Sequence, residues 1–268
     1  MSRASLPMYD LPELRQATDA WWTGLARAFA AEGLDEVPSN VERDIDLSEE
    51  WRDPGLLFSQ TCGYPLTHAF AGIVQPVATP VYVAAGCAGP KYSSAIIVRA
   101  DDPAQTLADL RGRTAGINYL TSQSGYNVLR HMVAPLAVDG RFFGAVVETG
   151  GHPGSIAAVA DGRADVAAVD CVTYALFQRA QPDAVAGLRV LTYSPQVPAL
   201  PYVTSAGADA DRLCRLQAGV QRALADPDLA DTRATLLIDG AEPLPVDAYQ
   251  PILDMEAEAL ALGYPRVA

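Results

Sequence analysis

Short apolar segments alternate along the chain with segments in which apolar residues recur every three or four positions. The apolar segments predict strands at 4–9, 56–61, 74–83, 94–99, 114–118, 145–148, 165–169, 188–193 and 202–205. The periodic segments predict helices that begin near residues 11, 106, 124, 153, 172 and 209, with a last helix over 246–262. Because strands that alternate with helices form βαβ units, we expect an α/β protein whose mainly parallel sheets are flanked by helices.

Two segments have the composition of connections between two lobes. Residues 92–102 follow a loop rich in glycine and proline and end in a charged run. Residues 188–201 contain three prolines, which stiffen an extended connection. We therefore expect two crossover strands that join a first lobe, built from residues 1–98 and 201–268, to a second lobe of residues 99–200.

The charge of the chain limits its partners. It has 19 basic and 32 acidic residues, a formal net charge of -13, and Lys91 as its only lysine. The arginines are scattered, so no basic patch is visible that would attract nucleic acid or an anionic membrane. Half of the residues are hydrophobic and 19% are charged, which favours a folded protein with a well-buried core.

The sequence has no signature of export or of membrane insertion. Residues 1–10 lack the apolar run of a secretory leader, and residues 11–29 contain several charges, as an amphipathic helix does. No segment approaches the roughly 18 uncharged apolar residues that a membrane span requires. With Met1 as the natural start we expect a cytoplasmic protein, whereas a leader that has been removed would indicate export.

The four cysteines, Cys62, Cys87, Cys171 and Cys214, include no C-x-x-C pair. Zinc ribbons and thioredoxin-like motifs are therefore unsupported. One interpretation is that all four are buried free thiols, since cysteine packs as a small hydrophobic residue. Because Cys62 and Cys87 both lie in loop-like contexts, a disulfide between them is the alternative, and it would require an oxidising compartment.

Two loops that follow a strand and precede a helix are candidate anion sites. In residues 118–127, Ser122, Gln123 and Ser124 stand where the helix begins, and free N–H groups at a helix start bind anions. An ordinary serine N-cap explains one of these serines but not the whole run.

The second loop, residues 149–155, contains two glycines and a proline that suits the first helical turn. This places His152 at or next to the N-cap, where its imidazole can donate to an anion. A purely structural histidine is the alternative.

Two further candidates lie at the ends of predicted strands. Asp170 stands at a carboxyl edge, where open α/β sheets bind ligands, and can hold an ammonium group or orient His152. Its simpler role is to cap the helix that begins near residue 172. Gln60 and Thr61 occupy the matching strand-to-helix loop of the other lobe. The alternative is that this loop is a plain turn without a role in binding.

Known enzyme motifs are missing from the sequence. It contains no G-x-S-x-G, G-x-x-x-x-G-K-[ST], G-x-G-x-x-G or H-E-x-x-H motif. The three histidines, His68, His131 and His152, have no partners at metal-ligand spacing. We expect no catalytic residues, no metal and no cofactor.

Several of these segments together resemble the phosphate/phosphonate-type solute-binding proteins of ABC importers. The resemblance rests on residues 5–9, 59–64, 89–99, 108–112, 122–126, 151–152 and 158–170, and it covers nearly the whole chain. It implies a two-lobed type II periplasmic-binding protein fold that closes over a ligand in a cleft between the lobes. It also implies a small-molecule ligand, an ABC permease as partner, a periplasmic location and a monomer.

The resemblance places the ligand against residues of both lobes. The expected ligand-binding residues are Tyr9, Gln60, Thr61, Tyr92, Ser122, Gln123, Ser124, His152 and Asp170. The serine-rich helix start and His152 would receive the anionic head. Tyr9 and Tyr92 would line the wall of the first lobe, and Asp170 would face an amine at the far end of the ligand.

The chain departs from this family at two motifs. It has Ser-Gln-Ser-Gly at 122–125 where phosphonate binders show Ser-Thr-Ser-Gly, and Gly-Gly-His at 150–152 where they show Gly-Ser-His. Since two hydroxyl donors are missing, the ligand class stays open.

Three hypotheses follow. The first is the substrate-binding component of an ABC importer for a small oxyanion such as phosphate, a phosphonate or a phosphate ester. The second is a binding protein or cytoplasmic sensor of the same fold for an uncharged or heterocyclic ligand such as a pyrimidine, on which tyrosines stack. The third is an enzyme that uses His152 and Asp170 as an acid/base pair.

Overall fold

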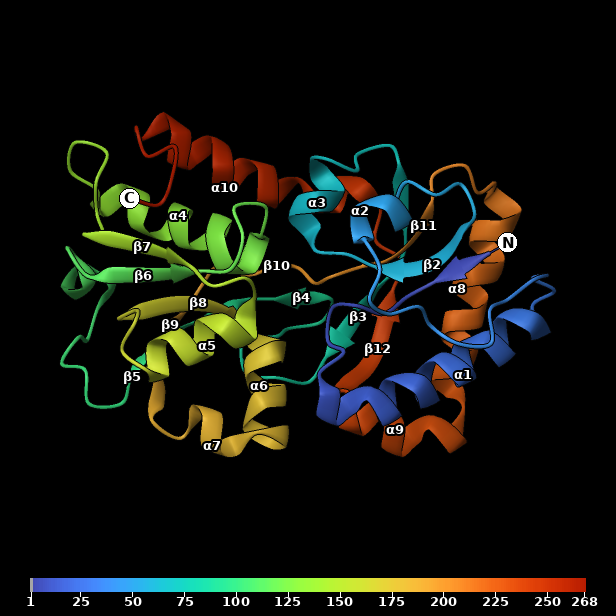
Figure 1. Cartoon of the computed structure of the whole chain (residues 1–268). Helices are drawn as coiled ribbons and strands as arrows, with labels where there is room; N and C mark the ends of the chain where they lie inside the picture. Colours follow the sequence, from blue (N-terminus) through green and yellow to red (C-terminus); the bar gives the residue numbers. More distant parts are fainter. Residues whose placement is uncertain (1) are drawn as a thin grey trace. The chain divides into compact units, whose positions relative to one another are not determined.

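The computed structural model describes residues 2–268 and divides them into two compact units (Figure 1). Unit 1 comprises the chain up to Val83, Ala88–Pro90 and Pro198–Tyr249. Unit 2 comprises Ala84–Cys87, Lys91–Val197 and Gln250–Ala268. Met1, with which the expected first lobe begins, lies outside the described residues.

Unit 1 is built on a five-stranded sheet in the order β1-β2-β11-β3-β12. Its strands are β1 (Arg3–Ala4), β2 (Leu56–Gln60), β3 (Val74–Tyr82), β11 (Tyr202–Ser205) and β12 (Ile238–Glu242). The β1 and β2 strands are parallel, whereas β11 is antiparallel to both β2 and β3, and β12 is antiparallel to β3.

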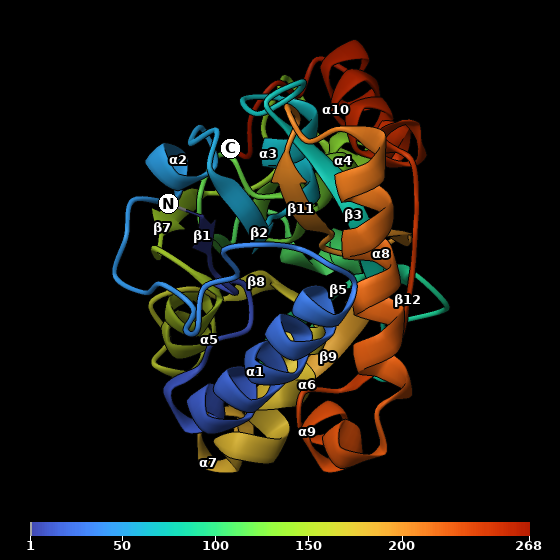
Figure 2. The same cartoon turned by 90° about the vertical axis from the view of Figure 1, so that its right-hand side faces the viewer.

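The helices of unit 1 are α1 (Arg15–Ala31), α2 (Leu47–Glu50), α3 (Gly63–Thr67), α8 (Ala210–Ala225) and α9 (Ala230–Thr235), with short turns η1 (Pro12–Leu14), η5 (Pro227–Leu229) and η6 (Val246–Tyr249). Helices α1 and α8 pack on each other, and Figure 2 shows them side by side. The periodic apolar positions of α1 form its buried face, where Trp22 and Phe29 join Phe58 of β2 in an aromatic cluster. This cluster is a large part of the core of unit 1.

Unit 2 is built on a second five-stranded sheet in the order β7-β6-β8-β5-β9. Its strands are β5 (Ser94–Arg99), β6 (Thr114–Ile117), β7 (Ala145–Glu148), β8 (Val166–Asp170) and β9 (Leu188–Tyr193). Two short strands lie outside this sheet: β4 (Lys91–Tyr92) in unit 2, and β10 (Val197–Pro198) at the point where the chain returns to unit 1. Strand β6 is parallel to β7 and β8, whereas β5 is antiparallel to β8 and β9.

The helices of unit 2 are α4 (Val128–Val133), α5 (His152–Ala160), α6 (Cys171–Ala180), α7 (Pro182–Val185) and α10 (Gln250–Ala261), with 3-10 turns η2 (Leu107–Leu110) and η4 (Ala134–Leu136) and the π-helical turn η3 (Gln123–Asn127). Turn η3 runs directly into α4, so the first turn of this continuous helix is wider than an α-helical turn.

The C-terminal helix α10 packs in unit 2 through a buried arginine of α4. Arg130 lies 2.9 Å from Glu256 Oε1, and its guanidinium donates to the carbonyl of Pro265 at 3.0 Å. Asn127 donates to the carbonyl of Ile252 at 3.0 Å. Because a buried charge needs such partners, the segment that supplies them is held here.

The units therefore differ from the expected lobes. The expected first lobe included the last nineteen residues (250–268), which the contacts of Arg130 hold in unit 2. It also included residues 94–98 of β5, which pairs with β8 and β9 in unit 2. The chain passes from unit 1 to unit 2 around residues 84–90 and at 249–250, and returns at 197–198.

The α/β class, with helices flanking sheets, is confirmed, but the expectation of mainly parallel sheets is wrong. Both sheets are mixed: β11 and β12 run antiparallel to β3 in the first sheet, and β5 runs antiparallel to β8 and β9 in the second. Strand β11 joins the first sheet only after the chain has returned from unit 2, so no local βαβ crossover fixes its direction. Strand β12 was not predicted, because its Ile-Asp-Gly-Ala-Glu sequence is polar and the strand lies at a sheet edge.

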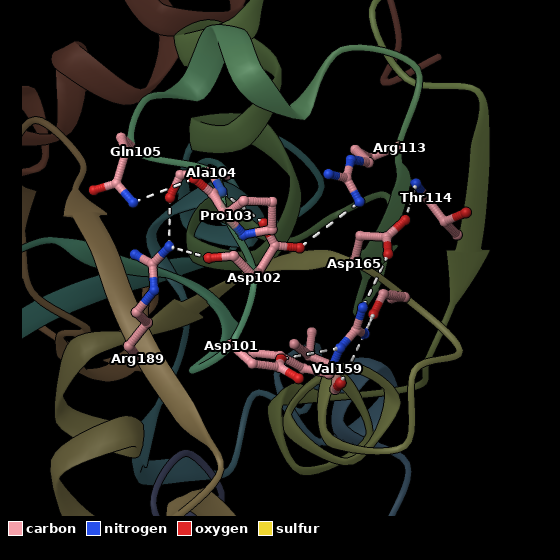
Figure 3. Close-up of polar contacts among 12 residues, drawn as sticks. Asp101, Asp102, Pro103, Ala104, Gln105, Arg113, Thr114, Val159, Asp165 and Arg189 are labelled. Atoms are coloured by element: carbon pink, nitrogen blue, oxygen red, sulfur yellow. Dashed lines mark hydrogen bonds and ion pairs between the residues drawn. The ribbon is translucent and has the colours of Figure 1, made fainter.

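The amino ends of β6 and β8 are tied together by charged side chains (Figure 3). Asp165 accepts from the backbone N–H of Thr114 at 2.9 Å and from Arg99 at 3.4 Å. The buried carboxylate of Asp102 lies 3.8 Å from Arg113, and Arg189 donates to the carbonyl of Asp102 at 2.8 Å. We call Arg99, Asp102, Arg113, Asp165 and Arg189 the arginine-aspartate network. Its charges face one another, which lets them be partly buried.

Candidate functional site

The candidate site lies at the opposite edge of the same sheet, where β6, β7 and β8 end. These three strands are parallel, so the loops that follow them meet at one edge, and Ser94 at the start of β5 pairs there with Asp170. Each of the three loops leads directly into a helix: η3 with α4, α5 and α6. This is the edge at which open α/β sheets bind ligands.

Two of the predicted residues, which come from different loops, contact each other. Ser124 Oγ lies 2.8 Å from Nε2 of His152. The backbone carbonyl of Ser124 accepts from Ser94 Oγ at 2.8 Å, which fixes η3 to the sheet. The sequence predicted both residues as site members but gave no sign that they touch.

Asn118 completes this contact and was not selected from the sequence. Its Nδ2 lies 3.5 Å from His152 Nε2, and its Oδ1 accepts from the backbone N–H of Tyr119 at 3.0 Å. The side chain also fills the space beside Gly125, where an added Cβ would lie 1.8 Å from Asn118 Oδ1. The sequence feature that could have indicated Asn118 is a polar residue directly after a buried strand, followed by a glycine in the same loop.

The environment of His152 keeps its imidazole neutral. Burial lowers the pKa of His152 to about 4. The residue as a whole is only partly buried, but its Nδ1 atom is fully buried and has no hydrogen-bond partner among residues 2–268. If the Ser124 hydroxyl donates to Nε2, the ring hydrogen stands on Nδ1, which is then a buried donor without an acceptor. Such atoms are rare in proteins and point to a partner outside the chain.

Ser122 and Gln123 use their side chains within unit 2. Ser122 Oγ accepts from the backbone N–H of Gly125 at 3.0 Å, which is the N-cap role. Gln123 accepts from Asn127 at 2.7 Å and donates to the sulfur of Met255 at 3.3 Å. What η3 can offer a ligand is therefore the backbone N–H groups of its first turn other than that of Gly125, which already donates to Ser122.

Asp170 also has a capping role. One of its carboxylate oxygens accepts from the backbone N–H groups of Val172 at 2.8 Å and Thr173 at 3.0 Å. Asp170 thus caps helix α6, as the simpler interpretation of its sequence position predicted. Tyr92 was expected in the first lobe, but it lies buried on β4 in unit 2, because the chain enters unit 2 before this strand.

The remaining predicted residues lie together in unit 1. Tyr9 packs edge-on against Tyr82 with ring centroids 5.1 Å apart, and Gln60 donates to the Tyr82 hydroxyl and to the carbonyl of Leu200, both at 3.0 Å. Tyr9, Gln60 and Tyr82 line a small, largely apolar cavity of this unit. Thr61 follows Gln60, and its hydroxyl donates to the carbonyl of Cys62 at 3.3 Å.

All four cysteines are free in the described chain, so the alternative of a disulfide between Cys62 and Cys87 is not observed. Of the four thiols expected to be buried, only Cys171 is buried, and Cys214 is exposed. Cys62 precedes α3 of unit 1. Cys87 belongs to unit 2, where its sulfur lies 3.5 Å from that of Cys171.

The other two histidines have separate surroundings. His68 stacks on Tyr64 with ring centroids 3.8 Å apart, and His131 lies 3.4 Å from the carboxylate of Glu258. Across residues 2–268, no three His, Cys, Asp or Glu side chains are grouped so that they could hold a metal ion. None of the helices in this range is long and apolar enough to cross a membrane.

Comparison with known proteins gives a consistent result. Residues 56–253 match the model of a family described as ABC transporter, phosphonate, periplasmic substrate-binding protein. This match spans more than half of the chain. No curated protein matches the chain.

Solved structures share the fold at low sequence identity. A binding protein component of an ABC phosphonate transporter from Pseudomonas aeruginosa is 20% identical, with a TM-score of 0.78 over 98% of this chain and 87% of that one. PhnD1 of Prochlorococcus marinus, in complex with methylphosphonate, is 12% identical, with a TM-score of 0.76 and 98% of both chains covered. XAC2383 of Xanthomonas citri, bound to ATP, is 16% identical, with a TM-score of 0.67 and 98% of both chains covered. These similarities establish the two-lobed periplasmic-binding protein fold.

Proposed function

Because the chain belongs to the family of periplasmic substrate-binding proteins of ABC phosphonate transporters, we propose that it binds a small phosphorus oxyanion as the substrate-binding component of an importer. Members of this family are solute-binding proteins and not enzymes, so the hypothesis of an acid/base pair of His152 and Asp170 is wrong. The family functions in the periplasm with a membrane permease as partner.

The observation that carries the proposal is the buried Nδ1 atom of His152, which has no hydrogen-bond partner among the described residues. His152 is the first residue of α5, a helix of nine residues. Pro153 has no N–H and the N–H of Ser155 donates to the carbonyl of Gly151, so the N–H groups of His152 and Gly154 are the ones without an acceptor within this helix start. Ser124 holds the other ring nitrogen at 2.8 Å. An oxyanion at this point would accept from the imidazole and also interact favourably with the helix dipole.

Neutral donors are sufficient for such a ligand. None of Asn118, Ser124 and His152 carries a positive charge when the imidazole is neutral, and the chain as a whole has a net charge of -13. At physiological salt, surface charges are screened beyond about 8 Å, so nearby N–H groups dominate the local field. Backbone N–H groups at helix starts then stabilise the anion without a lysine or arginine.

The ligands of two relatives support the phosphorus oxyanion class. PhnD1 of Prochlorococcus marinus binds methylphosphonate, and XAC2383 of Xanthomonas citri binds ATP. Both ligands present tetrahedral phosphorus with anionic oxygens. The alternative of a stacked heterocycle has less support, because Tyr64 already stacks on His68 and Tyr9 packs on Tyr82.

Titration calorimetry with the purified chain tests the proposal. Methylphosphonate, inorganic phosphate and ATP are the probes, and uracil and cytosine represent the heterocyclic class. We expect saturable binding of at least one phosphorus oxyanion. A probe at a hundred times its dissociation constant raises the free energy of unfolding by about 2.7 kcal/mol, which a melting experiment detects. Binding of a pyrimidine alone would show that the oxyanion assignment is wrong.

The variant Ser124→Ala locates the site. Loss of its hydroxyl removes the partner that orients His152, and we expect the dissociation constant to rise about tenfold, or about 1.4 kcal/mol. Ser155→Ala is the matched control, because Ser155 is a buried serine of α5 whose hydroxyl bonds to Thr149 at 2.7 Å. Equal dissociation constants for both variants and the unmodified protein would place the ligand elsewhere.

A further inference from the structure

The structure brings two cysteines together that are far apart in the sequence. The sulfur atoms of Cys87 and Cys171 lie 3.5 Å apart, although the residues are separated by 84 positions. Cys171 is the first residue of α6 and directly follows Asp170. Cys87 ends the short segment 84–87, which the chain enters directly after unit 1. The pair has no role in the anion site described above.

The backbone around Cys87 is held against unit 2 by several hydrogen bonds. The carbonyl of Gly86 accepts from Ser93 Oγ at 2.9 Å and from Gln196 at 3.0 Å, and the N–H of Cys87 donates to the carbonyl of Ala84 at 3.0 Å. Cys171 is fixed on the other side, since its N–H donates to the carbonyl of Ser93 at 3.1 Å. Both thiols therefore stand on anchored backbone.

Gly86 permits this close approach. Its φ of +100° lies in the region that favours glycine, and an added Cβ would lie 3.1 Å from Cβ of Cys171 and 2.5 Å from Ser93 Oγ. A larger residue would push the segment 84–87 away from α6. The glycine is thus a condition for the contact between the sulfur atoms.

The two thiols differ in accessibility and in acidity. Cys87 is partly exposed, whereas Cys171 is buried. A hydrogen bond from the Cys171 thiol lowers the pKa of Cys87, and the same bond raises the pKa of Cys171. Since the thiolate is the nucleophile in thiol chemistry, Cys87 is the thiol that reacts first.

We propose that Cys87 and Cys171 are a modification site at which a disulfide-containing oxidant forms an intramolecular disulfide. The Cys87 thiolate attacks one sulfur of the oxidant, forms a mixed disulfide and releases one thiol of the oxidant. Cys171 then loses its proton and attacks Cys87 Sγ, which releases the second thiol. The two cysteines give up two electrons, and the oxidant disulfide is reduced to two thiols.

The geometry requires only a small movement for this bond. A disulfide has a sulfur–sulfur distance of about 2.05 Å, so the two atoms must approach by about 1.5 Å. The bond would join the segment 84–87, which connects the units along the chain, to the residue after Asp170. A cross-link that closes a loop of this length restricts the unfolded chain, so we expect the melting temperature to rise by about 5 °C or more.

Oxidised glutathione is the probe, and the background variant is C62S/C214S, which leaves only the proposed pair. We expect two free thiols in the reduced protein and none after oxidation, with a linked pair of peptides containing Cys87 and Cys171 in a proteolytic digest. Two thiols that persist after oxidation while the melting curve shows a folded protein would overturn the proposal.

Single variants test the order of the two steps. In C171S on the same background, Cys87 has no resolving partner, so we expect a stable mixed disulfide with glutathione on Cys87. In C87S, the buried Cys171 should stay unmodified under the same conditions. Modification of Cys171 in folded C87S, or no modification of Cys87 in C171S, would contradict the assignment of Cys87 as the first nucleophile.

Discussion

The two edges of the sheet in unit 2 use polar residues in opposite ways. At the amino ends of β6 and β8, the arginine-aspartate network joins arginines to two carboxylates and to backbone groups (Figure 3). At the carboxyl ends, Asn118, Ser124 and His152 form a cluster without a formal charge. We call these three residues the neutral cluster.

The difference lies in which groups are satisfied inside the chain. In the arginine-aspartate network each carboxylate has a cationic partner, so an anion from outside would have to displace Asp102 or Asp165. In the neutral cluster, His152 keeps a buried ring nitrogen without a partner among the described residues. Charged side chains that are paired with each other hold loops together, whereas buried neutral donors without a partner in the chain are available to bind a ligand.

Among the variants that test this difference between the two edges, Gly125→Ala is expected to have the largest effect on ligand affinity. The added Cβ would lie 1.8 Å from Asn118 Oδ1, so the side chain of Asn118 or the turn η3 must move. Since Asn118 and Ser124 flank His152, we expect the affinity for a phosphorus oxyanion to fall about 100-fold, or about 2.7 kcal/mol, as measured by titration calorimetry.

Gly187→Ala is the matched control, because this glycine of unit 2 has no atom within 4 Å of an added Cβ and precedes β9. Its affinity should stay within a factor of two of the unmodified protein. If Gly125→Ala binds as tightly as the control, the fit between Gly125 and Asn118 is irrelevant to the ligand.

Asp165→Ala tests the role of the arginine-aspartate network at the opposite edge of the sheet. It leaves the N–H of Thr114 without its acceptor and removes one of the partners of Arg99. We expect the free energy of unfolding to fall by about 1–3 kcal/mol while the dissociation constant of the ligand does not change. Thermal unfolding and calorimetry on the same sample measure both quantities.

Asp161→Ala provides the control for this edge. Asp161 is exposed and lies 3.5 Å from the exposed Arg163, and such surface pairs contribute little. We expect its unfolding free energy to change by less than about 0.5 kcal/mol. A weakened affinity in Asp165→Ala would mean that the two edges are coupled and do not have separate tasks.

Most elements of the fold could be predicted from the sequence, because burial imposes a clear pattern. The strands β2, β5, β7 and β9 begin where the apolar segments predicted, and the helices α1, α5 and α8 begin within four residues of the expected positions. Pairing could not be predicted, since the direction of β11 depends on where the chain returns from unit 2. The place of α10 depends on Arg130, whose long-range partners leave no periodic pattern.

The candidate site was predicted in part. A helix start after a buried strand is visible in the sequence, so Ser124 and His152 could be selected from their loops. The contact between them could not be predicted, because the two residues are 28 positions apart and meet only through the order of the strands in the sheet. Asn118 was missed for the same reason, and the proximity of Cys87 to Cys171 depends on the backbone of Gly86.

The last test of this comparison is the pH dependence that the neutral cluster gives to stability. The pKa of His152 is lowered to about 4 in the folded chain, whereas an unfolded histidine has a pKa near 6.5. Between these values the unfolded chain binds a proton that the folded chain does not bind. The free energy of unfolding should therefore fall as the pH is lowered from about 6.5 to about 4, by up to about 1.4 kcal/mol per pH unit.

Urea unfolding at several pH values measures this slope, and comparison with His152→Gln isolates the contribution of the imidazole. Saturation with a phosphorus oxyanion should reduce the slope, since an anion beside His152 favours its protonated form. A slope that survives in His152→Gln would show that the pH dependence arises from carboxylates instead, and the neutral state of the cluster would lose its support.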